Sequence, residues 1–109
     1  MALGFAMYAD PGHAWLRVTP HDVYSVGLGI QYFTPYSYQS SDGKYWYLEE
    51  DCDASTFIRA WEKVNGAKIK YRNSTTSGQS SIRKRWPLLD YRTWDRDAWV
   101  ERTKTFEAA

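Results

Sequence analysis

The chain has 109 residues, a formal net charge of +1 and one cysteine. Its 43% hydrophobic and 25% charged residues are typical of one folded domain with a modest core. One cysteine excludes an intramolecular disulfide, and no stretch approaches the roughly 20 apolar residues of a membrane span. The first ten residues lack the basic region and long apolar run of a signal peptide, so we expect a cytoplasmic protein. The unusual component is aromatic: six Trp, nine Tyr and four Phe.

The first third of the chain predicts two strands followed by a short helix. Residues 5–8 and 14–18 have strand character, and Pro11-Gly12 between them supplies a turn. Thr19 can cap a helix near residues 20–28, because Pro20 suits the first helical position and Asp22 can complete a capping box.

Residues 36–50 predict a second hairpin around Asp42-Gly43, a dipeptide typical of tight β-turns. A two-residue loop there places Tyr38 opposite Tyr47. Alternation then puts four tyrosines on one face: Tyr36, Tyr38, Tyr45 and Tyr47. Trp46 and Leu48 take the other face. One face must be the core side, and the other would be an unusually aromatic surface.

A helix is predicted near residues 54–64, with Asp53 as its cap and Asn65-Gly66 as its stop. Its apolar stripe consists of Phe57, Ile58, Trp61 and Val64. Residues 68–72 then alternate as a half-buried strand, with Ile69 and Tyr71 inward.

The remaining chain predicts a loop over residues 73–81, a short strand over 82–86 ended by Pro87, and a last helix near 93–106. The packing residues of that helix are Trp94, Ala98, Trp99 and Phe106. The expected fold is one α+β domain over residues 1–109, with an antiparallel sheet of four or five strands and a C-terminal helical tail from about residue 88.

The charged residues are segregated along the chain, and this gives two candidate partner-binding patches. The basic patch comprises Lys68, Lys70, Arg72, Arg83, Lys84 and Arg85. The acidic patch comprises Glu49, Glu50, Asp51 and Asp53. A third candidate surface is the aromatic face of the four tyrosines. The two charged patches can bind partners or balance each other within the fold.

Three features of the sequence bear on catalysis or metal binding: the clustered carboxylates, His13 and Cys52. Clustered carboxylates can bind a divalent cation, but carboxylates ahead of a helix are also favoured by capping and by the helix dipole, and we expect no metal and no cofactor. His13 follows a turn that Asp10 is expected to close, and no serine or cysteine is placed beside it. Cys52 has acidic neighbours that oppose thiolate formation, so we interpret it as a packing residue.

Three segments carry a resemblance to a known family: YADPGHAWL at residues 8–16, YSYQ at 36–39 and YLEEDCDA at 47–54, with a looser match of SSIR at 80–83. In this order they resemble a family of small phage-encoded proteins of unassigned function. The resemblance brings no catalytic residues. It implies a phage or prophage origin and therefore a role that acts on a host process.

From these features we expect a non-enzymatic protein that binds and inhibits a host protein or ribonucleoprotein complex, such as a CRISPR effector. One alternative is a nucleic-acid-binding accessory protein that uses the basic segment over residues 63–86. The other is a small metal-dependent nuclease that uses the acidic patch. No membrane partner is expected.

Overall fold

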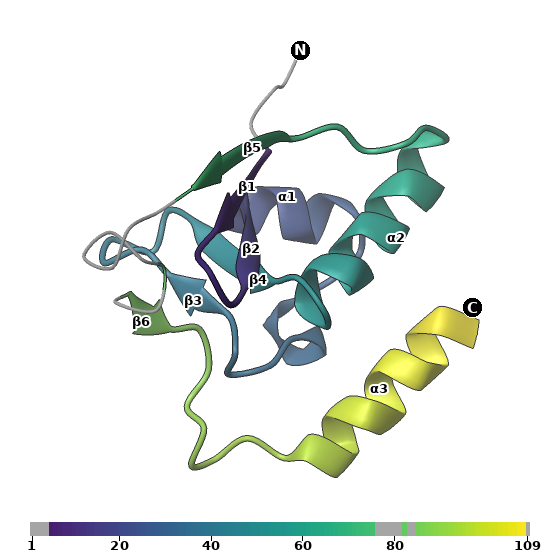
Figure 1. Ribbon diagram of the computed structural model, residues 1–109. Helices are drawn as coiled ribbons and strands as arrows, with labels where there is room; N and C mark the ends of the chain where they lie inside the picture. Colours follow the sequence, from purple (N-terminus) through teal and green to yellow (C-terminus); the bar gives the residue numbers. More distant parts are fainter. Residues whose placement is uncertain (1–4, 76–81, 83–84, 109) are drawn as a thin grey trace.

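Strands and helices from the whole length of the chain build an α+β fold around one open, mostly antiparallel sheet (Figure 1). The computed structural model describes residues 5–75, 82 and 85–108. The strands are β1 (Ala6–Ala9), β2 (Ala14–Val18), β3 (Tyr38–Gln39), β4 (Trp46–Glu49), β5 (Arg72–Thr75) and β6 (Trp86–Pro87). They lie in the order β5-β1-β2-β4-β3-β6. The predicted fold class is confirmed, with six strands among the described residues instead of the expected four or five.

The helices are α1 (Pro20–Ser25), α2 (Asp53–Asn65) and α3 (Arg96–Ala108), and a 3-10 turn, η1, covers Ile30–Tyr32. The capping box of α1 is confirmed, since Thr19 Oγ1 accepts from the Asp22 amide at 3.0 Å and Asp22 Oδ2 accepts from the Thr19 amide at 2.9 Å. No helix among the described residues is long and apolar enough to cross a membrane.

Local turn chemistry produces both hairpins as predicted. Asp10 Oδ1 accepts from the amides of Gly12 and His13, each at 2.9 Å, and so closes the β1–β2 turn. In the second hairpin Tyr38 lies opposite Tyr47, which is the predicted register. These two turns pair β1 with β2 and β3 with β4.

The predicted strand over residues 68–72 is wrong. The strand β5 begins at Arg72 and pairs in parallel with β1, with Ala6 opposite Arg72. Glu62 Oε2 accepts from the Ile69 amide at 3.0 Å, which holds the chain in an irregular path after α2. Ile69 packs against the core while Tyr71 is exposed. The predicted loop over 73–81 is wrong for residues 73–75, which belong to β5, and residues 76–81 lie outside the described part.

The boundaries of α2 are partly as predicted. Gly66 ends it in the left-handed region at φ 63°, as expected of an Asn-Gly stop. The expected cap is wrong: Cys52 occupies the N-cap position, and Asp53 lies buried in the first turn. Val64 is 60% exposed, so the predicted apolar stripe ends at Trp61.

Both faces of the sheet are covered by apolar side chains. On one face α1 and α2 cover the main core, whose largest buried side chains include Leu16, Val18, Phe33, Leu48 and Phe57. On the other face lies a smaller cluster of Trp15, Tyr47 and Ile82, with Tyr8 and Tyr38 packed against it. Alternation along β2 and β4 produces this division, because successive side chains point to opposite faces.

The C-terminal part departs from the predicted boundaries. The predicted strand over residues 82–86 is wrong, because Pro87 lies within the edge strand β6 instead of ending a strand before it. An edge strand tolerates proline, since the missing backbone N–H can be on the side that has no neighbouring strand. Helix α3 begins at Arg96, where Asp95 Oδ1 accepts from the Ala98 amide at 3.1 Å. In Figure 1 α3 (yellow) extends away from the sheet.

Two hydrogen bonds and a ring contact hold α3 on η1. Trp99 Nε1 donates to the Tyr32 carbonyl at 2.9 Å, and Arg102 Nη1 donates to the Gln31 carbonyl at 2.8 Å. The Phe106 ring lies on Tyr32 with centroids 5.4 Å apart. The predicted packing residues Trp94, Ala98, Trp99 and Phe106 are all half-buried.

Candidate binding groove

Two adjoining pockets form a groove beside the β4–α2 connection. The first, which we call the acidic pocket, measures about 320 Å³ and is lined by His13, Trp15, Tyr36, Tyr38, Glu49, Asp51 and Cys52. The second, the aromatic pocket, measures about 450 Å³ and is lined by Thr34, Tyr36, Cys52, Tyr91, Trp94, Arg96 and Trp99. Tyr36 and Cys52 line both pockets, so the two adjoin at these residues.

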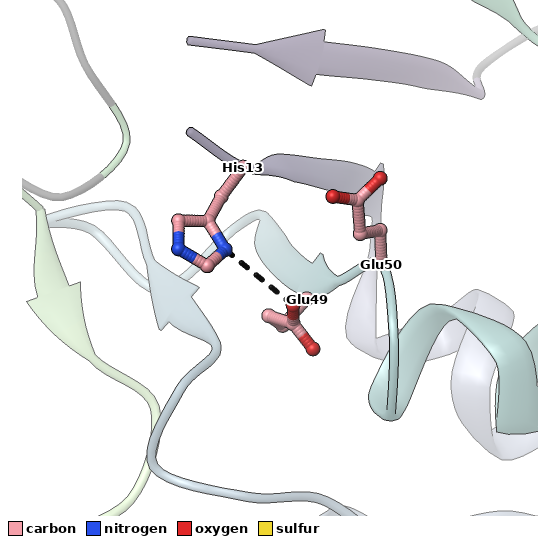
Figure 2. Close-up of side chains that lie close together, drawn as sticks. All are labelled: His13, Glu49 and Glu50. Carbon is pink, nitrogen blue, oxygen red and sulfur yellow. Dashed lines mark ion pairs between the residues drawn. The ribbon is translucent and has the colours of Figure 1, made fainter. Parts of the chain in front are cut away.

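Glu49 forms the wall of the acidic pocket at the end of β4. It is only 7% exposed, and its Oε1 accepts from the amides of Asp51 at 3.0 Å and Cys52 at 3.1 Å. Its Oε2 lies 3.9 Å from Nδ1 of His13, the residue that joins the β1–β2 turn to β2 (Figure 2). Burial raises the pKa of this carboxyl, although the two amides oppose the shift.

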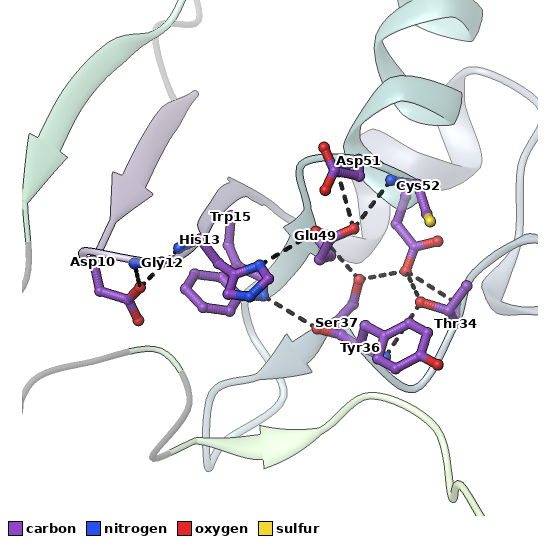
Figure 3. Close-up of polar contacts among 11 residues, drawn as sticks. Asp10, Gly12, His13, Trp15, Thr34, Tyr36, Ser37, Glu49, Asp51 and Cys52 are labelled. Atoms are coloured by element: carbon purple, nitrogen blue, oxygen red, sulfur yellow. Dashed lines mark hydrogen bonds and ion pairs between the residues drawn. The ribbon is translucent and has the colours of Figure 1, made fainter.

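A buried hydrogen-bond network centres on Asp53, and Figure 3 shows its members Thr34, Ser37 and Glu49. Asp53 Oδ2 accepts from the Thr34 amide at 2.9 Å, from the Thr34 hydroxyl at 2.8 Å and from the Ser37 hydroxyl. Ser37 Oγ in turn accepts from the Glu49 amide at 2.9 Å. Burial raises the pKa of Asp53 to about 6, while these hydrogen bonds oppose the shift. The carboxyl therefore joins α2, residues 34–37 and β4.

This network fixes the backbone of Tyr36 while its ring remains 49% exposed. The Tyr36 amide donates to Thr34 Oγ1 at 3.2 Å, and its carbonyl accepts from Trp15 Nε1 at 3.1 Å. The ring makes edge contacts with Tyr91 and Trp94, with centroids 6.4 and 6.3 Å apart. Tyr91 is itself 66% exposed. A set of large aromatic side chains is thus held in place at the surface.

The predicted acidic patch is not one surface. Glu49 and Asp53 are buried and have separate hydrogen-bond partners, whereas Glu50 and Asp51 are exposed. The ligand atoms of Glu49, Glu50 and His13 all lie within 4.8 Å of one another, which is the arrangement of a possible metal site. Asp10 closes its turn, as expected.

The described members of the basic patch belong to separate parts of the sheet. Lys68 lies before β5 and forms an exposed ion pair with Glu62 at 3.8 Å. Lys70, also before β5, and Arg72, the first residue of β5, are exposed. Arg85 precedes β6, at the opposite edge in the strand order, and its guanidinium lies 5.6 Å from the centroid of the Tyr47 ring. Arg83 and Lys84 lie outside the described residues.

The four tyrosines of the predicted aromatic face have different environments. Tyr47 is buried and Tyr38 half-buried in the smaller cluster. Tyr45 is exposed and carries the Arg17 guanidinium at 4.8 Å from its ring centroid. Tyr36 precedes β3 and lines the groove.

Cys52 is half-buried between the two pockets. Burial, followed by the charges of Glu49, Asp53 and Asp51, raises the pKa of its thiol to about 11. This agrees with the expectation that acidic neighbours oppose the thiolate.

Sequence reasoning named four lining residues as partner-binding candidates, Tyr36, Tyr38, Glu49 and Asp51, but it did not place them together and it missed the rest of the groove. The pairing of β2 with β4 places Trp15 opposite Glu49, and this brings His13 to the same edge. Tyr91, Trp94 and the Trp99 indole reach the groove from the C-terminal part. The only signal for them was the high aromatic content. Comparisons of the chain with protein-family models, curated proteins and solved structures found no match.

Proposed function

We propose that this chain is a non-enzymatic protein of phage or prophage origin that docks on a host macromolecular complex, such as a CRISPR effector, and inhibits it. The observation that supports this best is the exposed aromatic groove around Tyr36. Tyrosine and tryptophan dominate the energetics of protein interfaces, because they bury a large area with little loss of side-chain freedom. The buried network under Tyr36 further reduces the ordering required on binding.

The charges of the groove favour a protein partner over nucleic acid. Glu49 and Asp51 line the acidic pocket, and Glu50 lies beside it. Carboxylates repel the phosphates that dominate nucleic-acid affinity. Among the described residues that line the two pockets, Arg96 is the one lysine or arginine, and it lies in the aromatic pocket.

The test is affinity capture from a nuclease-treated bacterial host lysate, followed by an activity assay of the captured complex. We compare the wild type with Tyr36→Ser and with the control Tyr24→Ser, which removes an exposed tyrosine of α1. The wild type and the control should retain a complex and inhibit it, whereas Tyr36→Ser should lose both properties.

Two results contradict the proposal. If all partners disappear after nuclease treatment, the nucleic-acid alternative is correct. If Tyr36→Ser binds and inhibits as well as the wild type, the groove is not the docking surface.

A second candidate function is a metal-dependent nuclease, and the cluster of His13, Glu49 and Glu50 is the observation that favours it. Incubation of the protein with DNA or RNA and Mg²⁺ or Mn²⁺ tests it directly. We expect no cleavage. Cleavage by the wild type that disappears in a Glu49→Gln, Glu50→Gln double variant would replace the binding proposal.

A further inference from the structure

We infer that the acidic pocket is a binding site for the guanidinium group of an arginine side chain presented by the partner protein. This inference rests on the proposed function, because the partner supplies the arginine. It specifies the chemistry that the groove recognises, and it follows from the charge, the rings and the size of the pocket.

The two carboxylates that line the pocket, Glu49 and Asp51, favour a cation with several hydrogen-bond donors. Glu49 directs Oε1 to two backbone amides, which fixes the carboxylate, and its Oε2 faces His13 at 3.9 Å, beyond hydrogen-bond distance. A donor from the partner would bind at Oε2 in competition with His13. Asp51 contributes a second, exposed carboxylate to the same pocket. A guanidinium presents five donors in a fork and can reach both carboxylates.

The walls of the pocket favour a planar cation. Trp15 and Tyr38 lie edge to face with centroids 6.0 Å apart, and His13 lies 6.0 Å from Trp15. The Tyr36 ring completes this wall at the boundary with the aromatic pocket. Arginine stacks on such rings through its flat face, whereas the ammonium of lysine is compact and more strongly hydrated.

The dimensions favour a side chain over a bare metal ion. A volume of about 320 Å³ is at the lower end for small-ligand pockets and suits one long side chain.

The test is a titration followed by two-dimensional NMR, with acetyl-Gly-Arg-Gly-amide as the probe. Parallel titrations use the lysine peptide and the citrulline peptide, which keeps the shape of arginine without its charge. We expect the arginine peptide to shift the Trp15 indole N–H and the amides of Asp51 and Cys52, with millimolar affinity. The lysine peptide should bind several-fold more weakly, and the citrulline peptide should cause no shift.

Variants locate the site. Asp51→Asn should weaken binding of the arginine peptide about threefold, and Glu49→Gln about tenfold. Glu49→Gln keeps an oxygen for the two amides, and the exposed Asp51 provides a second variant whose folding does not depend on them. The matched control Asp97→Asn, an exposed carboxylate on α3, should leave the affinity unchanged.

Three results would overturn the inference: equal shifts with the citrulline peptide, no shifts with the arginine peptide, or unchanged affinity in both pocket variants. A titration with Zn²⁺ or Mn²⁺ alone that shifts the same resonances, when the arginine peptide does not, would assign the pocket to a metal instead. If the arginine peptide fails but capture of a host complex still depends on Tyr36, the proposed function stands and only the arginine site is wrong.

Discussion

The buried carboxyl of Asp53 should make the protein more stable in mild acid than at neutral pH. The substitution Asp53→Asn tests this, because asparagine keeps an oxygen for the donors of Thr34 and Ser37 but carries no charge. Its amide takes the place of the buried Oδ1, which has no hydrogen-bond partner among the described residues, so the exchange breaks no hydrogen bond. The variant should therefore fold while losing the titration of this group.

The magnitude follows from the pKa. In the folded protein burial raises the pKa of Asp53 from 3.8 to about 6, so the neutral form is favoured by folding. Stability from this group is therefore gained as pH falls through about 6, and the gain ends near the ordinary value of an unfolded aspartate. The full shift corresponds to about 3 kcal/mol. At pH 5, one unit below the folded pKa, the gain relative to pH 7.5 is about 1.4 kcal/mol.

Urea denaturation of both proteins at several pH values between 5 and 7.5 measures this contribution. The raised pKa of Glu49 acts in the same direction, but Glu49 is present in both proteins, so the difference between them reports mainly on Asp53 and its interaction with Glu49. The difference in unfolding free energy between wild type and variant should therefore change by about 1.4 kcal/mol over this range. If the two proteins instead follow parallel pH profiles, Asp53 does not titrate near 6 and the account of its burial is wrong.

Three further predictions concern single residues. Cys52, with a thiol pKa of about 11, should react with iodoacetamide at pH 8 roughly a hundredfold more slowly than free cysteine, and equal rates would contradict its burial. Gly66→Ala should lower the unfolding free energy by about 1 kcal/mol in urea, because an alanine Cβ is strained at φ 63° although the space around it is open; an unchanged value would show that the turn relaxes. Trp99→Phe removes the 2.9 Å bond to the Tyr32 carbonyl, so hydrogen exchange should accelerate in α3 and not in the sheet, whereas unchanged protection of α3 would mean that other contacts hold it.

Features encoded by neighbouring residues could be predicted from the sequence. The Asp10 turn, the Thr19 capping box and the Gly66 helix end each depend on residues within about four positions of one another. The register of Tyr38 with Tyr47 followed from one tight turn. Each of these features has a local geometric cause, so no knowledge of the rest of the fold was needed.

Features that depend on long-range pairing could not be predicted. The strand β5 pairs in parallel with β1, so its position depends on residues more than 60 positions away. The segment before it alternates between apolar and basic residues, and this pattern led to the wrong prediction of a strand over residues 68–72. Asp53 had the sequence position of a cap, but its donors come from Thr34 and Ser37. The groove combines the end of β4, the β1–β2 turn and the C-terminal part, and hydrophobic periodicity contains no information about such proximity.

The Asp53 network explains how so small a chain can hold exposed aromatic residues in fixed positions. An ionised carboxyl in the core lowers stability, and an apolar residue there would avoid this cost. An apolar residue, however, could not accept the amide and hydroxyl donors of Thr34 and Ser37, and the segment that carries Tyr36 would lose its attachment to α2. Since an interface formed by already ordered side chains requires less ordering on binding, the same carboxyl that weakens the fold favours binding in the groove. If the groove binds a partner as proposed, stability and partner binding make opposite demands on Asp53.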